Sequence, residues 1–245
     1  MEELRGRVIG VTGASRGIGL AIASALLERG ARVALLARGE EELRAAAAGL
    51  GEGALPVVAD VRDPVAVAQG FERVVEHFGA LDGLVNNAAV GRIHRIEDAS
   101  DEDLRAQVEI NLLGPIFCCR TAIPHLRASG RGHIINVSSD SVERPFPFLG
   151  VYSATKAGLE TFTRALRDEL VGSGVRVTLL RLGPALTSFA RDWGEGAGDA
   201  IAAWQAGGYM DPTRVVRPEV VAEAAVQVLT LPVEASVHTL DVRPT

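Results

Sequence analysis

Short apolar runs alternate along the chain with longer segments of helical periodicity. The apolar runs cover residues 7–12, 32–37, 56–59, 84–86, 133–138, 175–181 and 237–242. The helical pattern covers 17–29, 40–50, 101–127, 151–171 and 218–229, with one more helix opened by Pro64. Because the apolar runs are continuous, we expect strands that are buried on both faces. The pattern predicts an α/β fold with one doubly wound parallel sheet of about seven strands and helices on both faces.

Residues 187–211 interrupt this alternation. They are rich in Gly and Ala, contain Trp193 and Trp204, and show no clear period. We expect a lid over a binding site here, with a loose surface excursion as the alternative. The chain shows no linker, repeat or biased tail, so residues 1–245 are expected to form one domain.

Composition narrows the function classes. A net charge of −6 argues against wholesale nucleic-acid binding, which needs a basic face. No apolar stretch approaches the roughly 18 residues of a membrane span, and the N-terminus lacks a signal-peptide pattern. We therefore expect a cytoplasmic protein without a membrane partner. Cys118 and Cys119 are adjacent and are interpreted as small apolar helix residues, with no disulfide and no metal site.

A glycine-rich turn follows the first predicted strand and opens the first predicted helix. Glycines at positions 13, 17 and 19 permit a sharp turn, close approach of a pyrophosphate, and tight packing of the helix on the sheet. The start of the helix adds free N–H groups and a positive dipole. This context predicts a Rossmann-type dinucleotide site that includes Gly13, Ser15, Arg16, Gly17, Ile18 and Gly19.

The same turn also fits a hydrolase motif. The segment from Gly13 to Gly17 matches G-x-S-x-G, which carries the nucleophile of α/β-hydrolases. In that fold several strands precede the motif, whereas here it follows the first strand. A phosphate-binding P-loop is excluded because no Lys follows the glycines. The dinucleotide interpretation is therefore preferred.

The second predicted strand ends in Leu36-Ala37-Arg38, with no acid at its tip. An acid at this place would bind the ribose diol of NAD, whereas an arginine neutralises the 2′-phosphate of NADP. Arg16 lies inside the glycine turn, and two guanidinium groups can converge on one phosphate. We expect NADP(H) in preference to NAD(H), although two solvated surface arginines would give the same pattern.

Tyr152 and Lys156 are spaced i, i+4 at the start of a predicted helix and so share one face. A free phenol has a pKa near 10, and lowering it by about 2–3 units takes roughly 3–4 kcal/mol. A nearby ammonium in a partly dry site can supply this, helped by a positively charged nicotinamide ring. Lys156 is the only lysine among 25 basic residues. A surface Tyr–Lys pair is the structural alternative.

The order of these motifs resembles the short-chain dehydrogenase/reductase family, single-domain branch, over essentially the whole chain. The matching segments are Thr12-Gly13 to Gly19, Asp60-Val61, Asn86-Asn87-Ala88, Asn111, Ser139, and Tyr152 with Lys156. The resemblance implies an oxidoreductase that interconverts a carbonyl and a secondary alcohol, the cofactor supplying the hydride chemistry.

The resemblance also implies residue roles. Ser139, 13 positions before Tyr152, would hold the substrate oxygen, and Tyr152 would transfer the proton. Lys156 would bind the nicotinamide ribose, and Asn111 would support a water in a proton relay. The remaining implied cofactor contacts are Asp60, Val61, Asn87, Ala88, Gly183, Ala185 and Thr187.

Two positions depart from the family pattern. Ala89 stands where Asn-Asn-Ala is usually followed by Gly, and Leu182-Gly183-Pro184 replaces the usual Pro-Gly after the sixth strand. Both positions lie at the edge of the sheet that would face the cofactor, and the sequence does not specify the backbone conformation there.

Substrate and assembly are weakly specified by the sequence. The expected substrate contacts are Ser139, Ser141, Arg144, Tyr152 and Trp193. Arg144 or Arg92 could bind a carboxylate, and residues 145–147 and 243–245 look like a subgroup that includes 3-hydroxy acid dehydrogenases. A 3-oxoacyl-thioester reductase is an equal alternative.

A redox sensor or scaffold that binds NADP(H) without catalysis is the rival class. It would be marked by loss of Ser139, Tyr152 or Lys156, and all three are present. By resemblance we expect a homo-oligomer, a tetramer or dimer, with helices 101–127 and 151–171 at one interface.

Overall fold

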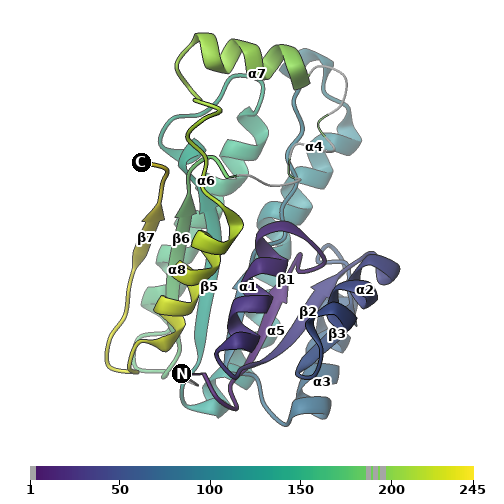
Figure 1. The fold of residues 1–245 in the computed structure, drawn as a ribbon, viewed down its shortest axis with the longest axis vertical. Coiled ribbons are helices and arrows are strands. Elements are labelled where there is room, and N and C mark those ends of the chain that lie inside the picture. Colours follow the sequence, from purple (N-terminus) through teal and green to yellow (C-terminus); the bar gives the residue numbers. More distant parts are fainter. Residues whose placement is uncertain (1–3, 186–188, 190–192, 194–196) are drawn as a thin grey trace.

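The computed structural model describes residues 4–185, 189, 193 and 197–245, and its centre is a seven-stranded parallel sheet (Figure 1). The strand order is β3-β2-β1-β4-β5-β6-β7. The strands are β1 (Val8–Thr12), β2 (Arg32–Ala37), β3 (Ala54–Val58), β4 (Gly83–Asn86), β5 (His133–Ser139), β6 (Arg176–Leu182) and β7 (Thr239–Val242). The chain order reverses between β1 and β4, which opens a crevice at the carboxyl edge of the sheet. The predicted fold class is confirmed.

Helices cover both faces of this sheet (Figure 1). One layer holds α1 (Gly17–Glu28), α2 (Glu40–Leu50) and α8 (Pro218–Thr230). The other holds α3 (Pro64–Phe78), α5 (Gly114–Ser129) and α6 (Gly150–Glu169), with α4 (Asp101–Val108) packed beside α6. A further helix, α7 (Ala197–Ala206), lies at the top of the view in Figure 1, beyond the carboxyl edge.

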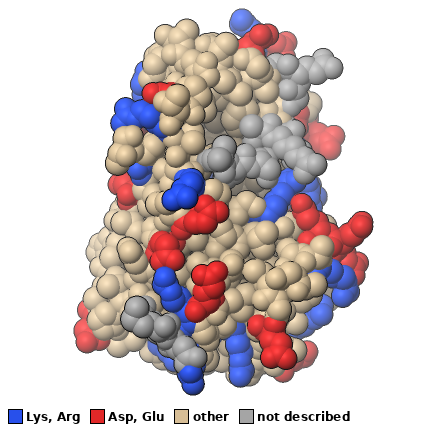
Figure 2. Space-filling view, in the orientation of Figure 1, with Lys and Arg blue, Asp and Glu red and all other residues tan. Residues whose placement is uncertain are grey.

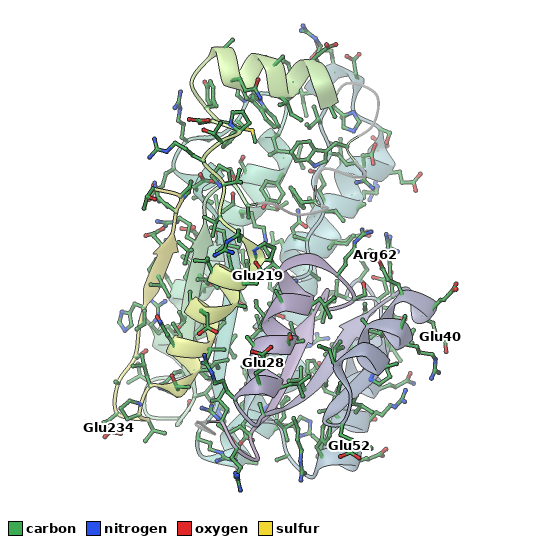
Figure 3. The ribbon with its side chains drawn as sticks, viewed as in Figure 1. Glu28, Glu40, Glu52, Arg62, Glu219 and Glu234 are labelled. Atoms are coloured by element: carbon green, nitrogen blue, oxygen red, sulfur yellow. The ribbon has the colours of Figure 1, made fainter. Side chains whose placement is uncertain are left out.

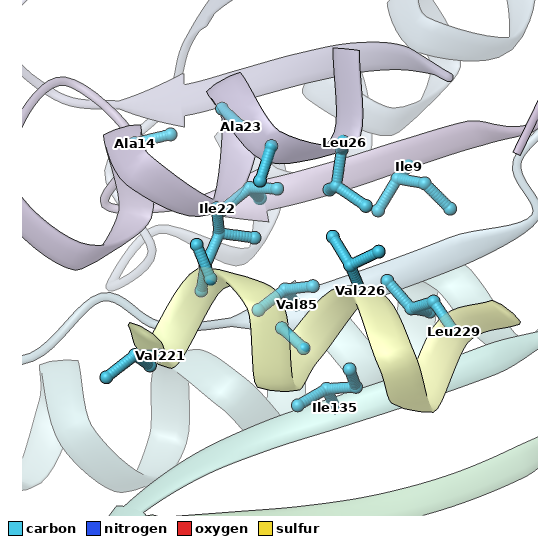
Figure 4. Close-up of a cluster of buried hydrophobic side chains, with 14 of the residues drawn as sticks. Ile9, Ala14, Ile22, Ala23, Leu26, Val85, Ile135, Val221, Val226 and Leu229 are labelled. Atoms are coloured by element: carbon cyan, nitrogen blue, oxygen red, sulfur yellow. The ribbon is translucent and has the colours of Figure 1, made fainter. Parts of the chain in front are cut away.

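The packing of α1 and α8 on the sheet forms a large part of the core (Figure 4). Ile22 and Leu26 of α1 meet Val226 and Leu229 of α8 over the sheet residue Ile135. All are fully or almost fully buried. Each such side chain contributes roughly 1.5–3 kcal/mol by leaving water, so this layer holds the first strand and the glycine turn in place.

Three element boundaries differ from the sequence expectation. The strand predicted at 56–59 spans Ala54–Val58 and so begins two residues earlier. Pro56 has no backbone N–H to donate, and it is tolerated inside this strand because β3 is an edge strand. The helix predicted at 101–127 is divided by a π-helical turn at Glu109–Leu113. The segment expected to be irregular contains α7, whose Trp204 is buried.

Side chains cap the starts of two helices. The Ser100 hydroxyl accepts from the backbone N–H of Asp103 at the start of α4. Asp63 caps α3, with Pro64 at its first position. Both caps satisfy backbone donors that the helix leaves open.

The surface carries charges of both signs. On the face shown in Figure 2, acidic and basic groups are interspersed over the lower half. Among the described helices, none is long and apolar enough to cross a membrane. Within the segment expected as a lid, residues 187, 188, 190–192 and 194–196 lie outside the described residues, and these include Thr187.

Candidate functional site

A cavity of about 860 Å³ opens at the carboxyl edge of the sheet. Its wall is formed by the glycine turn, the ends of the central strands, the first turns of α6, and residues of α7. Parallel strands all deliver their carboxyl ends to one edge, so residues far apart in sequence meet here. One end of the cavity lies by β2 and β3, and the other lies under α7.

The glycine turn has the shape that a bound phosphate requires. Gly13 and Gly17 adopt left-handed φ values of 66° and 58°. A Cβ at Gly13 would stand 2.9 Å from the Cα of Ala88, and one at Gly19 would collide with the carbonyl oxygen of Gly13. Beside Gly17 the space is open. The turn thus combines close packing behind with free volume in front of the α1 N-terminus, which fits a dinucleotide pyrophosphate.

Two side chains hold this turn against the neighbouring strand. The Thr12 hydroxyl accepts from the backbone N–H groups of Asn87 and Ala88, both at 3.0 Å. The Asn87 side-chain amide donates to the carbonyl oxygens of Thr12 and Gly13 at 3.0 and 3.3 Å. Asn87 and Ala88 line the cavity. The Asn-Asn-Ala segment therefore fixes the floor of the cavity through hydrogen bonds to the first strand.

The end of the cavity by β2 carries groups of both signs. Arg16 and Arg38 line it, as do Glu42 and Asp60. Glu42 accepts a 2.9 Å hydrogen bond from the Ser15 hydroxyl. The sequence reading did not single out Glu42, although it belongs to an acidic first turn at the start of α2.

Asp60 is engaged by a neighbouring arginine. The Arg62 guanidinium binds the Asp60 carboxylate at 2.6 Å and holds its pKa below the usual range. Arg62 lies on the same side of the molecule as Glu40 of α2 (Figure 3). Together with Arg38, this gives the wall beside the edge strands a mixed, locally compensated charge.

Ser139, Tyr152 and Lys156 meet in the cavity wall. Ser139 ends β5, whereas Tyr152 and Lys156 share one face of α6. The Ser139 hydroxyl donates to Asp140 at 3.2 Å and accepts from the backbone N–H of Ser141 at 3.2 Å. The Lys156 Nζ lies 5.7 Å from the centre of the Tyr152 ring and donates to the carbonyl of Val137 at 2.8 Å.

The ionisation of this pair differs from the sequence expectation. Burial raises the pKa of Tyr152 above its ordinary value, a hydrogen bond with Ser139 lowers it, and the charge of Asp140 raises it again. Burial also lowers the pKa of Lys156 to about 8. In the chain by itself the pKa of the phenol is therefore raised, whereas the expected depression was for a site that also holds a positively charged nicotinamide ring. Loss of water is the largest cause, and it holds the phenol neutral.

Asn111 is placed by the π-helical turn, where it is completely buried. Its side chain accepts from the N–H of Val90 and donates to the Val90 carbonyl, both at 2.8 Å. It also donates to the Thr155 hydroxyl at 3.2 Å. Asn111 thus ties the segment after β4 to α6, one residue before Lys156, and stands behind the cavity wall.

The other implied cofactor residues fall along the same wall. Val61, Gly183 and Ala185 line the cavity, and so do the departures from the family pattern, Ala89 and Leu182 to Pro184. Ala185 forms a parallel bridge with Val216, which anchors the segment after β6. Thr187 lies outside the described residues.

The expected substrate residues separate into two groups. Ser141 and Trp193 line the cavity together with Ser139 and Tyr152. Arg144 stands apart from the described lining. Its guanidinium donates to the carbonyls of Gly208 and Gly207 at 2.7 and 3.1 Å and stacks 4.0 Å from the Tyr209 ring centre. Trp204, which belongs to the segment expected as a lid, also lines the cavity, as do Ile201 and Met210, which the sequence did not single out. Ile201 and Trp204 show the i, i+3 spacing of a helix.

Comparison with known proteins identifies the family and similar relatives of this chain. The family described as short chain dehydrogenase matches residues 7–198. A 3-oxoacyl-[acyl-carrier-protein] reductase of Bos taurus is 36% identical over 189 residues, covering 77% of this chain and 80% of its own.

Solved structures agree over nearly the whole chain. A serine dehydrogenase complexed with NADP+ has a TM-score of 0.88 at 31% identity, covering 97% of this chain and 94% of its own. A 3-ketoacyl-(acyl-carrier-protein) reductase from Brucella melitensis complexed with NADH has a TM-score of 0.85 at 30% identity, covering 98% of each chain.

Proposed function

This chain belongs to the short-chain dehydrogenase family, and we propose that it is an NADP(H)-dependent oxidoreductase that interconverts a carbonyl and a secondary alcohol. One observation carries the proposal. Ser139, Tyr152 and Lys156 line the same cavity as the glycine turn, so a dinucleotide and a carbonyl oxygen can occupy it together. We further propose that residues 1–245 act as one domain and that 187–211 is its substrate lid.

The cofactor would lie along the carboxyl edge. Its pyrophosphate would bind at the turn from Gly13 to Gly19, and its adenosine end beside Asp60 and Val61. Asn87, Ala88 and the segment around Gly183 and Ala185 would line its path, with Thr187 at the nicotinamide end. NADP(H) is favoured by Arg16 and Arg38, while Glu42 opposes a second negative charge. The two similar structures described above carry one cofactor of each kind, so selection rests on these side chains.

When bound, the cofactor supplies or accepts the hydride. The chain handles the oxygen and the proton. The Ser139 and Tyr152 hydroxyls would donate to a carbonyl oxygen between them, where negative charge develops during reduction. A buried phenol with a raised pKa is protonated at neutral pH, as a general acid must be. Lys156 would hold the cofactor ribose, and Asn111 would support the relay that returns the proton.

The proposal is tested by replacing the phenol alone. Tyr152→Phe is expected to lower kcat/KM for NADPH-dependent ketone reduction by about 10²–10⁴-fold, the range for a general acid. Absorbance at 340 nm follows NADPH, and circular dichroism and NADPH binding verify the fold and the site. Tyr209→Phe changes the chain's other tyrosine and is the matched control. Equal turnover by wild type and Tyr152→Phe, with NADPH bound by both, would instead favour the sensor or scaffold.

Cofactor choice has its own test. Arg38→Ala is expected to raise the KM for NADPH by about 10- to 100-fold with little change for NADH, because a charged hydrogen bond to phosphate is worth roughly 1.5–3 kcal/mol. Arg44→Ala removes an exposed arginine paired with Glu40 and serves as the control. An equal effect on both cofactors contradicts the role of Arg38.

Among substrates, we favour a 3-oxoacyl thioester over a free 3-hydroxy acid. The bovine relative bears the name of a 3-oxoacyl reductase, and both arginines considered for a carboxylate are engaged by the protein.

We also propose a homo-oligomer, dimer or tetramer, formed through α4, α5 and α6. Val108 and Leu113 are exposed apolar residues at this place, and sedimentation equilibrium tests it.

A further inference from the structure

The aromatic side chains of this protein are concentrated at the α7 end of the cavity. Both tryptophans, both tyrosines and three of the seven phenylalanines belong to one cluster. From the Tyr152 ring, centre-to-centre distances run 5.3 Å to Phe189, 5.7 Å on to Trp193 and 5.5 Å on to Trp204. The first of these contacts is tilted and the other two are edge-to-face, and such series of rings present flat apolar surface at low entropic cost. The wall that continues from the reacting hydroxyl is therefore aromatic.

The cations at this end are already engaged. Arg92 donates to Asp103 and to the Gly91 carbonyl, both at 3.1 Å. The Lys156 Nζ donates to the carbonyl of Val137, and the Arg144 guanidinium donates to two backbone carbonyls outside the cavity. The acid Asp140 lines the cavity next to Ser139. Among the described residues, an anionic substrate would thus meet an acid and no uncommitted cation, while losing its hydration.

The two tryptophans differ in their hydrogen bonds. The Nε1 of Trp204 donates to the carbonyl of Pro147 at 2.8 Å. The Nε1 of Trp193 is buried and finds no partner within the described part of the chain. Trp193 lines the cavity. A buried donor without a partner is destabilising, and a ligand acceptor would remove that cost.

We propose that this end of the cavity takes an uncharged ketone or alcohol that carries an aromatic or comparably large apolar group and a second hydrogen-bond acceptor for Trp193 Nε1. The proposal rests on the proposed function and names its substrate class. A 3-oxo ester or thioester attached to a bulky group meets these requirements. The corresponding free carboxylate does not.

Matched substrates test the charge requirement. Methyl 4-acetylbenzoate and 4-acetylbenzoate present the same ketone with and without a charge, and ethyl benzoylacetate adds the 3-oxo ester arrangement. We expect kcat/KM with NADPH to be at least about tenfold higher for the esters, since the carboxylate would lose its hydration without gaining a cation partner. Turnover of 4-acetylbenzoate equal to that of its ester overturns the proposal.

Paired tryptophan variants test the second acceptor. Trp193→Phe keeps an aromatic ring but removes the donor, so it should lower kcat/KM about 3- to 10-fold for the esters and leave acetophenone unchanged, as expected for one neutral hydrogen bond. Trp204→Phe is the control, and any effect it has should be equal for esters and acetophenone. A Trp193→Phe effect of the same size on acetophenone refutes the role of the donor.

Binding without turnover separates this proposal from the proposed function. The two tryptophans of the chain both lie in the cluster, so quenching of their emission reports on this end of the cavity. The ester should quench at concentrations where 4-acetylbenzoate does not. If the ester quenches selectively but no ketone is reduced, the proposed function fails while the inference on ligand class stands. If ketones are reduced regardless of charge, only the inference fails.

Discussion

We predict that the buried ammonium of Lys156 lowers the free energy of unfolding of this protein. It is completely buried by α6 and β5, and its pKa falls from 10.5 to about 8 because the ammonium loses water. Replacing it by methionine keeps a similar volume and removes the charge. We therefore expect Lys156→Met to be inactive and yet more stable than the wild type at neutral pH.

The magnitude follows from the two pKa values. Because the folded pKa is the lower one, the unfolded chain binds the proton more tightly, and the full penalty applies below pH 8. The difference between 10.5 and about 8 corresponds to about 3 kcal/mol at pH 7, falling to about 2 kcal/mol at pH 9. Losing the hydrogen bond to Val137 costs about 1 kcal/mol. The net gain is thus about 2 kcal/mol at pH 7 and about 1 kcal/mol at pH 9.

Urea unfolding followed by far-UV circular dichroism measures this gain at the two pH values. Arg44→Met removes an exposed cation and should change the free energy of unfolding by less than about 0.5 kcal/mol. A Lys156→Met variant that is less stable than wild type at pH 7, or whose advantage is the same at pH 9, would refute the reasoning that burial sets the pKa of this lysine.

Three further outcomes are expected from urea titrations. Gly19→Ala should lower the free energy of unfolding by about 1–3 kcal/mol and weaken NADPH binding, because its Cβ meets backbone across the glycine turn. Gly49→Ala, at an exposed position inside α2 with open space, should leave NADPH binding unchanged and should not lower stability. Arg181→Met should lower the free energy of unfolding by about 3–5 kcal/mol, because the buried Glu160 carboxylate loses its partner at 2.8 Å. The double variant that also carries Glu160→Leu should regain most of this stability. Burial lowers the pKa of His133 to about 3, so wild type should lose stability as pH falls below 6.5, by roughly 2 kcal/mol at pH 5, and His133→Leu should lose less.

The sheet was predictable because its strands are buried on both faces. Such strands must be continuously apolar, and the runs at 32–37 and 133–138 match β2 and β5 almost to the residue. Helix starts were predictable where one side chain caps the backbone, as Ser100 does for α4. These signals are local, so a single sequence contains them.

The missed features depend on distant partners. The guanidinium of Arg144 donates to the backbone carbonyls of Gly207 and Gly208, more than 60 positions away. Asn111 acquires its place from a π-helical turn and from contacts with Val90 and Thr155. No pattern near these residues reveals such partners, so their surroundings were not predictable.

The sequence by itself determined the α/β fold, the glycine turn and the shared helix face of Tyr152 and Lys156, while Ser139 was added to this pair by the resemblance to the family. Periodicity, turn chemistry and the geometry of parallel strands are sufficient for that. Only the tertiary structure decided the ionisation of Tyr152 and Lys156 and the aromatic, charge-compensated character of the α7 end. Desolvation and hydrogen-bond partners are properties of the folded arrangement, because they depend on which distant groups exclude water from a site.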